Sequence, residues 1–229
     1  MLLALLLSVA PAASAHTFSA HALTDFPVLI GVGAGYESPQ RVRLDASGGF
    51  MPGPYLDATN ATLVAFDVYS ETTAELIDIL LQGSLVLRAE AGWRPWDDRG
   101  WYAGLGYQFL GLAGDTTDLS LYTDGIEADI LRRAEEQTGS LEVSVAPHML
   151  TGRIGHEWIL QERFVVRGSL GFAYTVSSSS TVSSTESGRG AAAQAAIDAV
   201  ESAAESYLDD VFESWVHSPM LGVSGGYRF

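Results

Sequence analysis

The chain has 229 residues and a formal net charge of −16; it contains no cysteine, and all twelve of its basic residues are arginine. The negative charge argues against nucleic acid as a partner, because phosphate binding needs positive charge. The lack of cysteine excludes disulfide bonds and thiolate metal sites. Beyond the first residues no stretch approaches about 18 uninterrupted apolar residues, which excludes a helical membrane protein.

The chain begins with an apolar segment, residues 1–15, that is broken at Pro11 and ends in Ala13-Ser14-Ala15. Fifteen residues are too few for a membrane-spanning helix, which needs about 20. The Ala-x-Ala ending is typical of the site at which a secretory signal peptide is cleaved. We therefore expect residues 1–15 to be a signal peptide and residues 16–229 to form one mature domain.

Three β-hairpins are predicted, each made of an alternating run that ends in an aromatic residue, a short polar turn and a second alternating run. The paired runs are Gly31–Tyr36 with Val42–Met51, Arg88–Trp93 with Trp101–Ala113, and Gly152–Trp158 with Phe164–Val176. The first of the turns is Glu37-Ser-Pro-Gln40. A much longer connection follows each hairpin. Short turns at one end and long loops at the other are typical of membrane β-barrels.

The C-terminal segment adds a seventh strand, and membrane barrels of this kind have an even number. The segment Thr17 to Leu23, with Thr24 to Pro27 as its turn, is our candidate for the eighth. The run Thr62 to Tyr69 competes for the same role. We expect eight strands.

The C-terminal strand carries Leu221, Val223, Tyr227 and Phe229 on alternate positions, separated by small or charged residues. This period of two indicates a strand with one apolar and one polar face. The segment resembles the closing strand of small Gram-negative outer membrane β-barrel proteins, whose assembly machinery reads an aromatic-terminated end. The resemblance implies an antiparallel up-and-down transmembrane β-barrel in the cell outer membrane. It also implies outer membrane lipid, lipopolysaccharide and the barrel assembly machinery as partners.

The strand faces assigned to the outside of the barrel are free of charge. A soluble β-sandwich or ligand-enclosing barrel also alternates, but its outer face meets water and usually carries charged residues. Here the outer faces are apolar, and their aromatic residues lie near strand ends, as in the girdles of membrane barrels. The strand that contains His148 and His156 fits this pattern less well, because both histidines fall on its apolar face. We favour the transmembrane barrel over the soluble fold.

The opposite faces hold arginines and carboxylates, with glycine and serine over much of the remaining surface. We predict a lumen network of Arg43, Asp45, Arg88, Glu90, Arg94, Arg153, Glu157, Arg167 and Arg228. The interior of an eight-stranded barrel is just wide enough for side chains to fill, and guanidinium–carboxylate pairs satisfy buried polar groups. Six arginines against three carboxylates leave a charge of +3, which would also suit an anion-attracting channel. We favour the closed network because the barrel is narrow.

The long connections hold most of the acidic residues and three helical patterns, at about 71–82, 124–137 and 191–215. In the third, apolar residues recur every three or four positions, opposite an acidic face. We expect a helical cap on the extracellular end; an apolar groove for a lipid, a peptide or a second copy is the alternative. Acidic groups at a membrane surface would attract divalent cations. The chain has no calcium-loop motif, so such binding would be diffuse and no metal site is predicted.

No catalytic residue and no cofactor is predicted. His148 and His217 could lie near the outer rim beside Asp209 or Asp210, the minimum for a lipid hydrolase. The chain has neither a G-x-S-x-G nor an H-E-x-x-H motif, however. We therefore expect a non-enzymatic integral outer membrane protein with a closed lumen and an acidic cap that contacts cations, lipopolysaccharide or a partner. The alternatives are a transport protein or channel for small or apolar solutes, and a lipid hydrolase.

Overall fold

A computed structural model of the chain describes residues 16–27, 29–54, 56–57, 61, 84–96, 100–116, 141–184, 191–215 and 217–229. Four of the sequence predictions lie outside these residues. They are the signal peptide at 1–15, the candidate strand at 62–69, and the helical patterns at 71–82 and 124–137.

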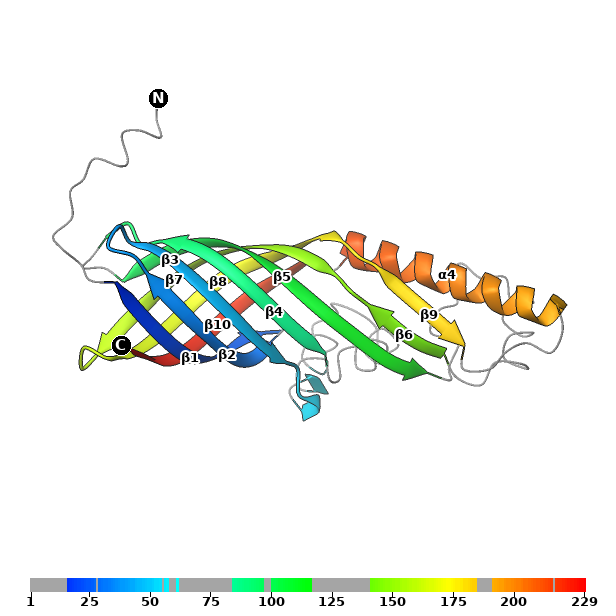
Figure 1. The fold of residues 1–229 in the computed structure, drawn as a ribbon, viewed down its shortest axis with the longest axis horizontal. Helices are drawn as coiled ribbons and strands as arrows, with labels where there is room; N and C mark the ends of the chain where they lie inside the picture. Colours follow the sequence, from blue (N-terminus) through cyan, green and yellow to red (C-terminus); the bar gives the residue numbers. More distant parts are fainter. Residues whose placement is uncertain are drawn as a thin grey trace, which may run out of the picture.

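Eight antiparallel strands close into a barrel (Figure 1). They are β1 (Thr17–Phe26), β2 (Leu29–Glu37), β3 (Val42–Phe50), β4 (Leu85–Trp93), β5 (Trp101–Thr116), β7 (His148–Leu160), β8 (Phe164–Ser177) and β10 (His217–Arg228). Each strand pairs with the next of these along the chain, and β1 pairs with β10 to close the ring. The predicted eight-stranded, up-and-down architecture is confirmed.

The first strand is the N-terminal candidate, because Thr17–Phe26 pairs with β2 on one side and with β10 on the other. The turn predicted at Thr24 to Pro27 is wrong, since β1 continues to Phe26. The longer strand makes Asp25 a strand residue, and this side chain is buried. Its position follows from the alternation along β1, which also turns His21 inward.

The connections divide the barrel into two ends. The turns that join β2 to β3, β4 to β5 and β7 to β8 lie at the end where β1 begins and β10 finishes, which we call the short-turn end (Figure 1). The opposite end, where the three long connections begin, is the long-loop end. This arrangement is the one predicted from the hairpins.

The outer surface of the barrel is an apolar belt. Leu105, Val32 and Leu170 are 75%, 67% and 60% exposed, values that would be unfavourable in water across so wide a patch. Along β8 the exposed aromatic residues Phe164 and Tyr174 are ten positions apart. At about 3.3 Å per residue and a tilt of about 40°, this separation spans about 25 Å, the height of the apolar band of a membrane barrel. The barrel therefore has the surface of a transmembrane protein, as predicted.

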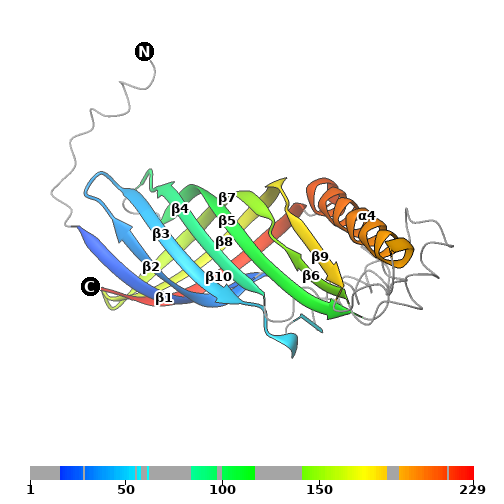
Figure 2. The ribbon, with the colours of Figure 1, turned by 45° about the vertical axis from the view of Figure 1, so that its right-hand side comes forward.

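Beyond the long-loop end, part of the barrel wall continues as a small sheet. Strand β6 (Leu141–Val145) pairs with the end of β5, and β9 (Ser180–Ser184) pairs with β6. Only two residues separate β6 from β7 and two separate β8 from β9, so both short strands prolong barrel strands. Helix α4 (Ala191–Trp215) lies beside this extension (Figures 1 and 2). The helix predicted at 191–215 is confirmed, and among the described helices none is both long and apolar enough to cross a bilayer.

An apolar core joins α4 to the extension and continues into the barrel. The helix contributes one buried stripe, Val200, Ala204, Leu208 and Phe212. The extension contributes inward residues of β5, β6 and β9, and the long-loop end of the lumen contributes the remainder, namely Leu29, Val86, Leu110, Met149, Ala173 and Met220. An apolar layer therefore fills the barrel at this end. The buried stripe agrees with a packed cap rather than an open groove along α4.

Replacing Leu208 with alanine is expected to loosen α4 from the extension. Leu208 is 1% exposed within the core, and truncation of a buried leucine costs about 2–5 kcal/mol. Limited proteolysis in detergent should cleave α4 faster in this variant. Ser202→Ala, at an exposed position of the same helix, is the control and should match the unaltered protein. Equal cleavage of the two variants would contradict the packing role.

Candidate functional site

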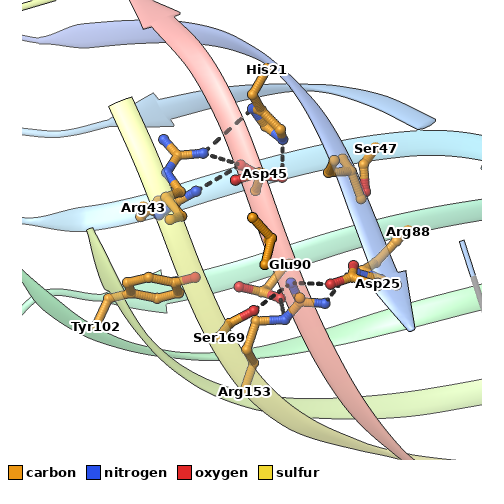
Figure 3. Close-up of a pocket in the computed structure, with 15 residues that line it drawn as sticks. His21, Asp25, Arg43, Asp45, Ser47, Arg88, Glu90, Tyr102, Arg153 and Ser169 are labelled. Carbon is orange, nitrogen blue, oxygen red and sulfur yellow. Dashed lines mark hydrogen bonds and ion pairs between the residues drawn. The ribbon is translucent and has the colours of Figure 1, made fainter. Parts of the chain in front are cut away.

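Charged side chains from six barrel strands, β1, β2, β3, β4, β7 and β8, form ion pairs in the lumen below the apolar layer. Figure 3 shows part of this network. The side chains form two groups, which we call the Asp25 cluster and the Glu157 cluster after the carboxylate that each surrounds. Strand alternation turns these side chains inward while their neighbours face outward. The pairing of β1 with β10 then brings residues from the two ends of the chain into one interior.

In the Asp25 cluster two arginines share one carboxylate. Asp25 is 1% exposed and accepts hydrogen bonds from Arg88 and Arg153, the latter through Nη2 at 3.0 Å. Arg153 Nε also lies 3.3 Å from Glu90 Oε2. Arg88 donates twice to Gln108 Oε1, at 3.0 Å and 2.8 Å. These bonds join β1, β4, β5 and β7 across the lumen.

In the Glu157 cluster three arginines surround one carboxylate. Glu157 is 5% exposed; its Oε1 lies 2.5 Å from Arg94 Nη2, and its Oε2 accepts from Arg167 Nε at 2.6 Å. Arg43 Nη1 lies 3.5 Å from the same Oε2. Arg94 reaches a second carboxylate, Glu37, at 3.1 Å. Each of these charges therefore has a partner of opposite sign.

Asp45 links Arg43 to the N-terminal strand. Its Oδ2 accepts from Arg43 Nη2 at 3.0 Å and lies 3.7 Å from Arg167 Nη1. Its Oδ1 lies 3.4 Å from His21 Nε2. The Arg43 guanidinium also stacks on the ring of Tyr102, 4.8 Å from its centroid, so an aromatic face supports the cation from β5 (Figure 3).

The structure brings nearly all residues of the predicted lumen network together. Of its nine residues, eight form ion pairs with one another or with Asp25 and Glu37. Arg228, the ninth, donates to Thr17 Oγ1 at 3.0 Å and lines a small cavity beside Arg43 and Glu157. The predicted charge of +3 is wrong, because five carboxylates rather than three face the six arginines.

Asp25 and Glu37 are the two carboxylates that sequence reasoning missed, because both were assigned to turns. Each is a strand residue instead, in β1 and β2. A signal was present in both cases, because residues an even number of positions apart in a strand face the same side. Asp25 lies four positions after the inward-facing His21, and Glu37 lies two positions after Gly35 and four after Gly33. Extending each alternation by one step would have placed both carboxylates in the lumen.

Glycines make room for the charged side chains. A Cβ on Gly104 would lie 2.7 Å from Glu90 Oε1, and one on Gly33 would lie 2.5 Å from His21 Nε2. Both distances are well below van der Waals contact, so the Glu90 carboxylate and the His21 ring each rest directly on the bare backbone of the next strand. The predicted inward glycines therefore set how closely the lumen packs.

Little space remains between these side chains. A cavity of about 30 Å³ lies between the two clusters, and one of about 10 Å³ lies towards the short-turn end. A water molecule needs roughly 10–15 Å³ of such volume. Several buried polar atoms of the lumen have no hydrogen-bond partner in the described part of the protein; they are Arg43 Nε and Nη1, Arg94 Nε, Thr151 Oγ1 and Arg153 Nε. The arrangement suits one or two waters rather than a solute.

The C-terminal strand has the predicted alternation. Leu221 and Val223 face outward and are about half exposed. Tyr227 packs edge-on against Phe164, and the amide of Phe229 donates to the carbonyl of Phe18 in β1. The end of the chain is therefore part of the closed barrel. Its role as an assembly signal stays a prediction.

The histidines considered for hydrolysis are set in the barrel wall. His148 Nδ1 contacts the hydroxyl of Tyr107, and its ring packs on Phe109 at 5.4 Å. His217 pairs through its backbone with Tyr174 of β8. The contacts described for His148 are thus aromatic, without the carboxylate that a histidine–acid pair requires.

No protein-family model and no curated protein matches the chain. Several solved structures are similar in fold. The N-terminal β-barrel domain of Pseudomonas aeruginosa OprF is 11% identical, with 93% of this chain and 96% of that one covered and a TM-score of 0.40. Acinetobacter baumannii CarO is 15% identical, with 92% and 97% covered and a TM-score of 0.41. A major outer membrane protein from Thermus thermophilus is 15% identical, with 94% and 100% covered and a TM-score of 0.46.

Proposed function

We propose that this protein is a non-enzymatic integral protein of the outer membrane, with a lumen closed by charged pairs and an acidic region outside the barrel. The observation that carries the proposal is the match of five arginines with five carboxylates in the two clusters. The water-sized cavities and the apolar layer above support it, because a solute would have to displace both.

The location rests on three features of the chain. They are the predicted signal peptide at residues 1–15, the C-terminal strand that resembles the one read by the barrel assembly machinery, and the apolar belt of about 25 Å. Barrels close every backbone hydrogen bond between strands, which is what a chain needs in hydrocarbon. Outer membrane lipid is therefore the proposed environment of the belt.

The region outside the barrel is acidic. Strands β6 and β9 and helix α4 carry no arginine, whereas the arginines of the described residues lie in the barrel strands or their short turns. Exposed carboxylates such as Glu142 and Asp198 face solvent in this region. We propose diffuse binding of Ca²⁺ or Mg²⁺ here, through which the protein would contact lipopolysaccharide phosphates.

Reconstitution into planar bilayers tests the closed lumen. The folded protein, verified by a heat-dependent shift in gel migration, is expected to show no discrete current at either polarity. An open porin inserted under the same conditions is the control for successful fusion. Stable unitary currents would contradict the proposal and favour the channel for small solutes. Release of fatty acid from the same lipids would favour the hydrolase.

A further inference from the structure

Strand β9 ends the sheet outside the barrel, so one of its sides has no neighbouring strand among the described residues. Ser179, an odd-numbered residue beside β9, bonds towards β6 through its carbonyl, which accepts from Ala146 at 2.9 Å. Because backbone groups alternate in direction along a strand, the even-numbered amides point away from β6. This open side is the edge of β9.

Helix α4 lies beside β9 (Figures 1 and 2). Four of its carboxylates, which we call the carboxylate ladder, contact the edge of β9. Three of them accept hydrogen bonds from even-numbered backbone amides, and one accepts from a serine hydroxyl. The pairs are Glu201 with the amide of Ser184 at 2.6 Å, Glu205 with the amide of Val182 at 2.9 Å, Asp209 with Ser180 Oγ at 2.7 Å, and Glu213 with the amide of Ser178 at 3.2 Å.

The spacing of the ladder matches that of a strand edge. Successive carboxylates are four helical residues apart, a rise of about 6 Å. Successive even-numbered residues of a strand are about 6.6 Å apart. The pairing also runs in opposite directions, since Glu201 meets Ser184 and Glu213 meets Ser178. The ladder thus presents acceptors as an antiparallel neighbouring strand would.

The ladder carboxylates do not stabilise the helix itself. Like charges four residues apart destabilise an isolated helix by about 0.2–0.5 kcal/mol per pair. The first turn of α4 has no acidic residue and its last turn no basic one, so its charges are not placed to suit the helix dipole either. The sequence analysis placed the acidic residues of this helix opposite the apolar stripe, whereas the ladder carboxylates contact β9 and Ser178, which precedes it. Contact with the β9 amides is what offsets the repulsion.

Strand β9 carries no protection of its own. Exposed edges are usually guarded by charged residues, proline or bulges. Residues Ser180–Ser184 read Ser-Thr-Val-Ser-Ser and include neither a charged residue nor a proline. Without the ladder, the amides of Ser178 and Val182 would be available to an extended chain.

We propose that the edge of β9 is a strand-docking surface that the carboxylate ladder keeps closed, and that its partner when uncovered is the β9 edge of a second copy. Two such edges are identical, so they can pair about a two-fold axis, each supplying donors and acceptors to the other. The β9 strands themselves carry no charge, so the paired residues would not repel one another once the ladder is displaced. Because β9 runs away from the barrel, an antiparallel pair joins two barrels end to end. This inference is independent of whether the lumen conducts.

The open-edge variant, Glu201→Ala with Glu205→Ala and Glu213→Ala, tests this inference. Its matched control replaces the same residues with glutamine, which removes equal charge and keeps an acceptor oxygen. In the open-edge variant we expect amide exchange of Ser178, Val182 and Ser184 to accelerate at least tenfold. We also expect a concentration-dependent dimer in detergent, measured by light scattering after size exclusion. The glutamine control is expected to exchange slowly and remain monomeric.

A proline in the same background locates the contact. The amide of Ser184 faces α4 and not β6, so Ser184→Pro removes an edge donor without breaking the β6 pairing. Added to the open-edge variant, it is expected to abolish the dimer. A dimer that survives the proline, or a monomer despite fast exchange, would overturn the second-copy partner; unchanged exchange would overturn the ladder as the cover. If the triple variant does not fold, Glu205→Ala alone tests whether the ladder covers the edge. The measurement is then amide exchange of Val182.

Discussion

Replacement of Glu157 with glutamine is expected to lower the free energy of unfolding by about 3–5 kcal/mol, the cost of removing one partner from a buried ion pair. Glu157 is the shared partner of Arg94, Arg167 and Arg43, and it is almost fully buried. Glutamine has nearly the same shape, so the change removes charge and leaves volume intact. Three guanidinium groups would then face one another with less compensation.

Urea unfolding in lipid vesicles, followed by tryptophan fluorescence, measures this loss. Glu142→Gln is the matched control, because Glu142 is exposed on β6 outside the belt. The control is expected to change stability by no more than about 0.5 kcal/mol. Similar stability of the two variants would show that the Glu157 cluster does not hold the barrel together.

Replacement of Gly222 with leucine is expected to prevent the barrel from closing. A Cβ at this inward position would collide with Asp25 Oδ1 and Ser169 Oγ. Asp25 cannot move aside without breaking its bonds to Arg88 and Arg153. Overpacking and the loss of a buried ion-pair network together are expected to lower the free energy of unfolding by about 4 kcal/mol or more.

The control lies in the same strand, three residues further on. Gly225 faces outward, and a Cβ there would meet nothing within 4 Å. Gly225→Leu adds an apolar side chain to the belt and is expected to leave folding unchanged. Heat-dependent gel migration after refolding distinguishes the variants: Gly225→Leu should give the folded band and Gly222→Leu should not. A folded Gly222→Leu barrel would mean that β10 adopts a different register.

The two layers of the lumen closure have different physical origins. The apolar layer at the long-loop end is part of the core that also holds α4. The charged layer below it is held by ion pairs between five arginines and five carboxylates. A change in α4 is therefore expected to act on the apolar layer first, whereas Glu157→Gln acts on the charged layer alone.

The errors of sequence interpretation fall at element ends and in contacts between distant residues. Asp25 and Glu37 were left out of the predicted lumen network, because turn-forming neighbours suggested that their strands ended earlier. The contact of the ladder with β9 was not predicted, because helical periodicity shows which residues share a side of the helix and not what that side contacts. Strands β6 and β9 were not separated from the loops around them, since short uncharged runs carry weak strand signals.

Local alternation was enough to determine the barrel class, its apolar exterior and the inward direction of the arginines, because in a strand the side of each residue depends only on its position. The tertiary structure alone decided which charges meet. Arg153 reaches Asp25 across 128 positions of the chain, and that encounter depends on the register in which β10 closes onto β1. Register and closure are properties of the whole ring, so no single segment encodes the balance of charge inside it.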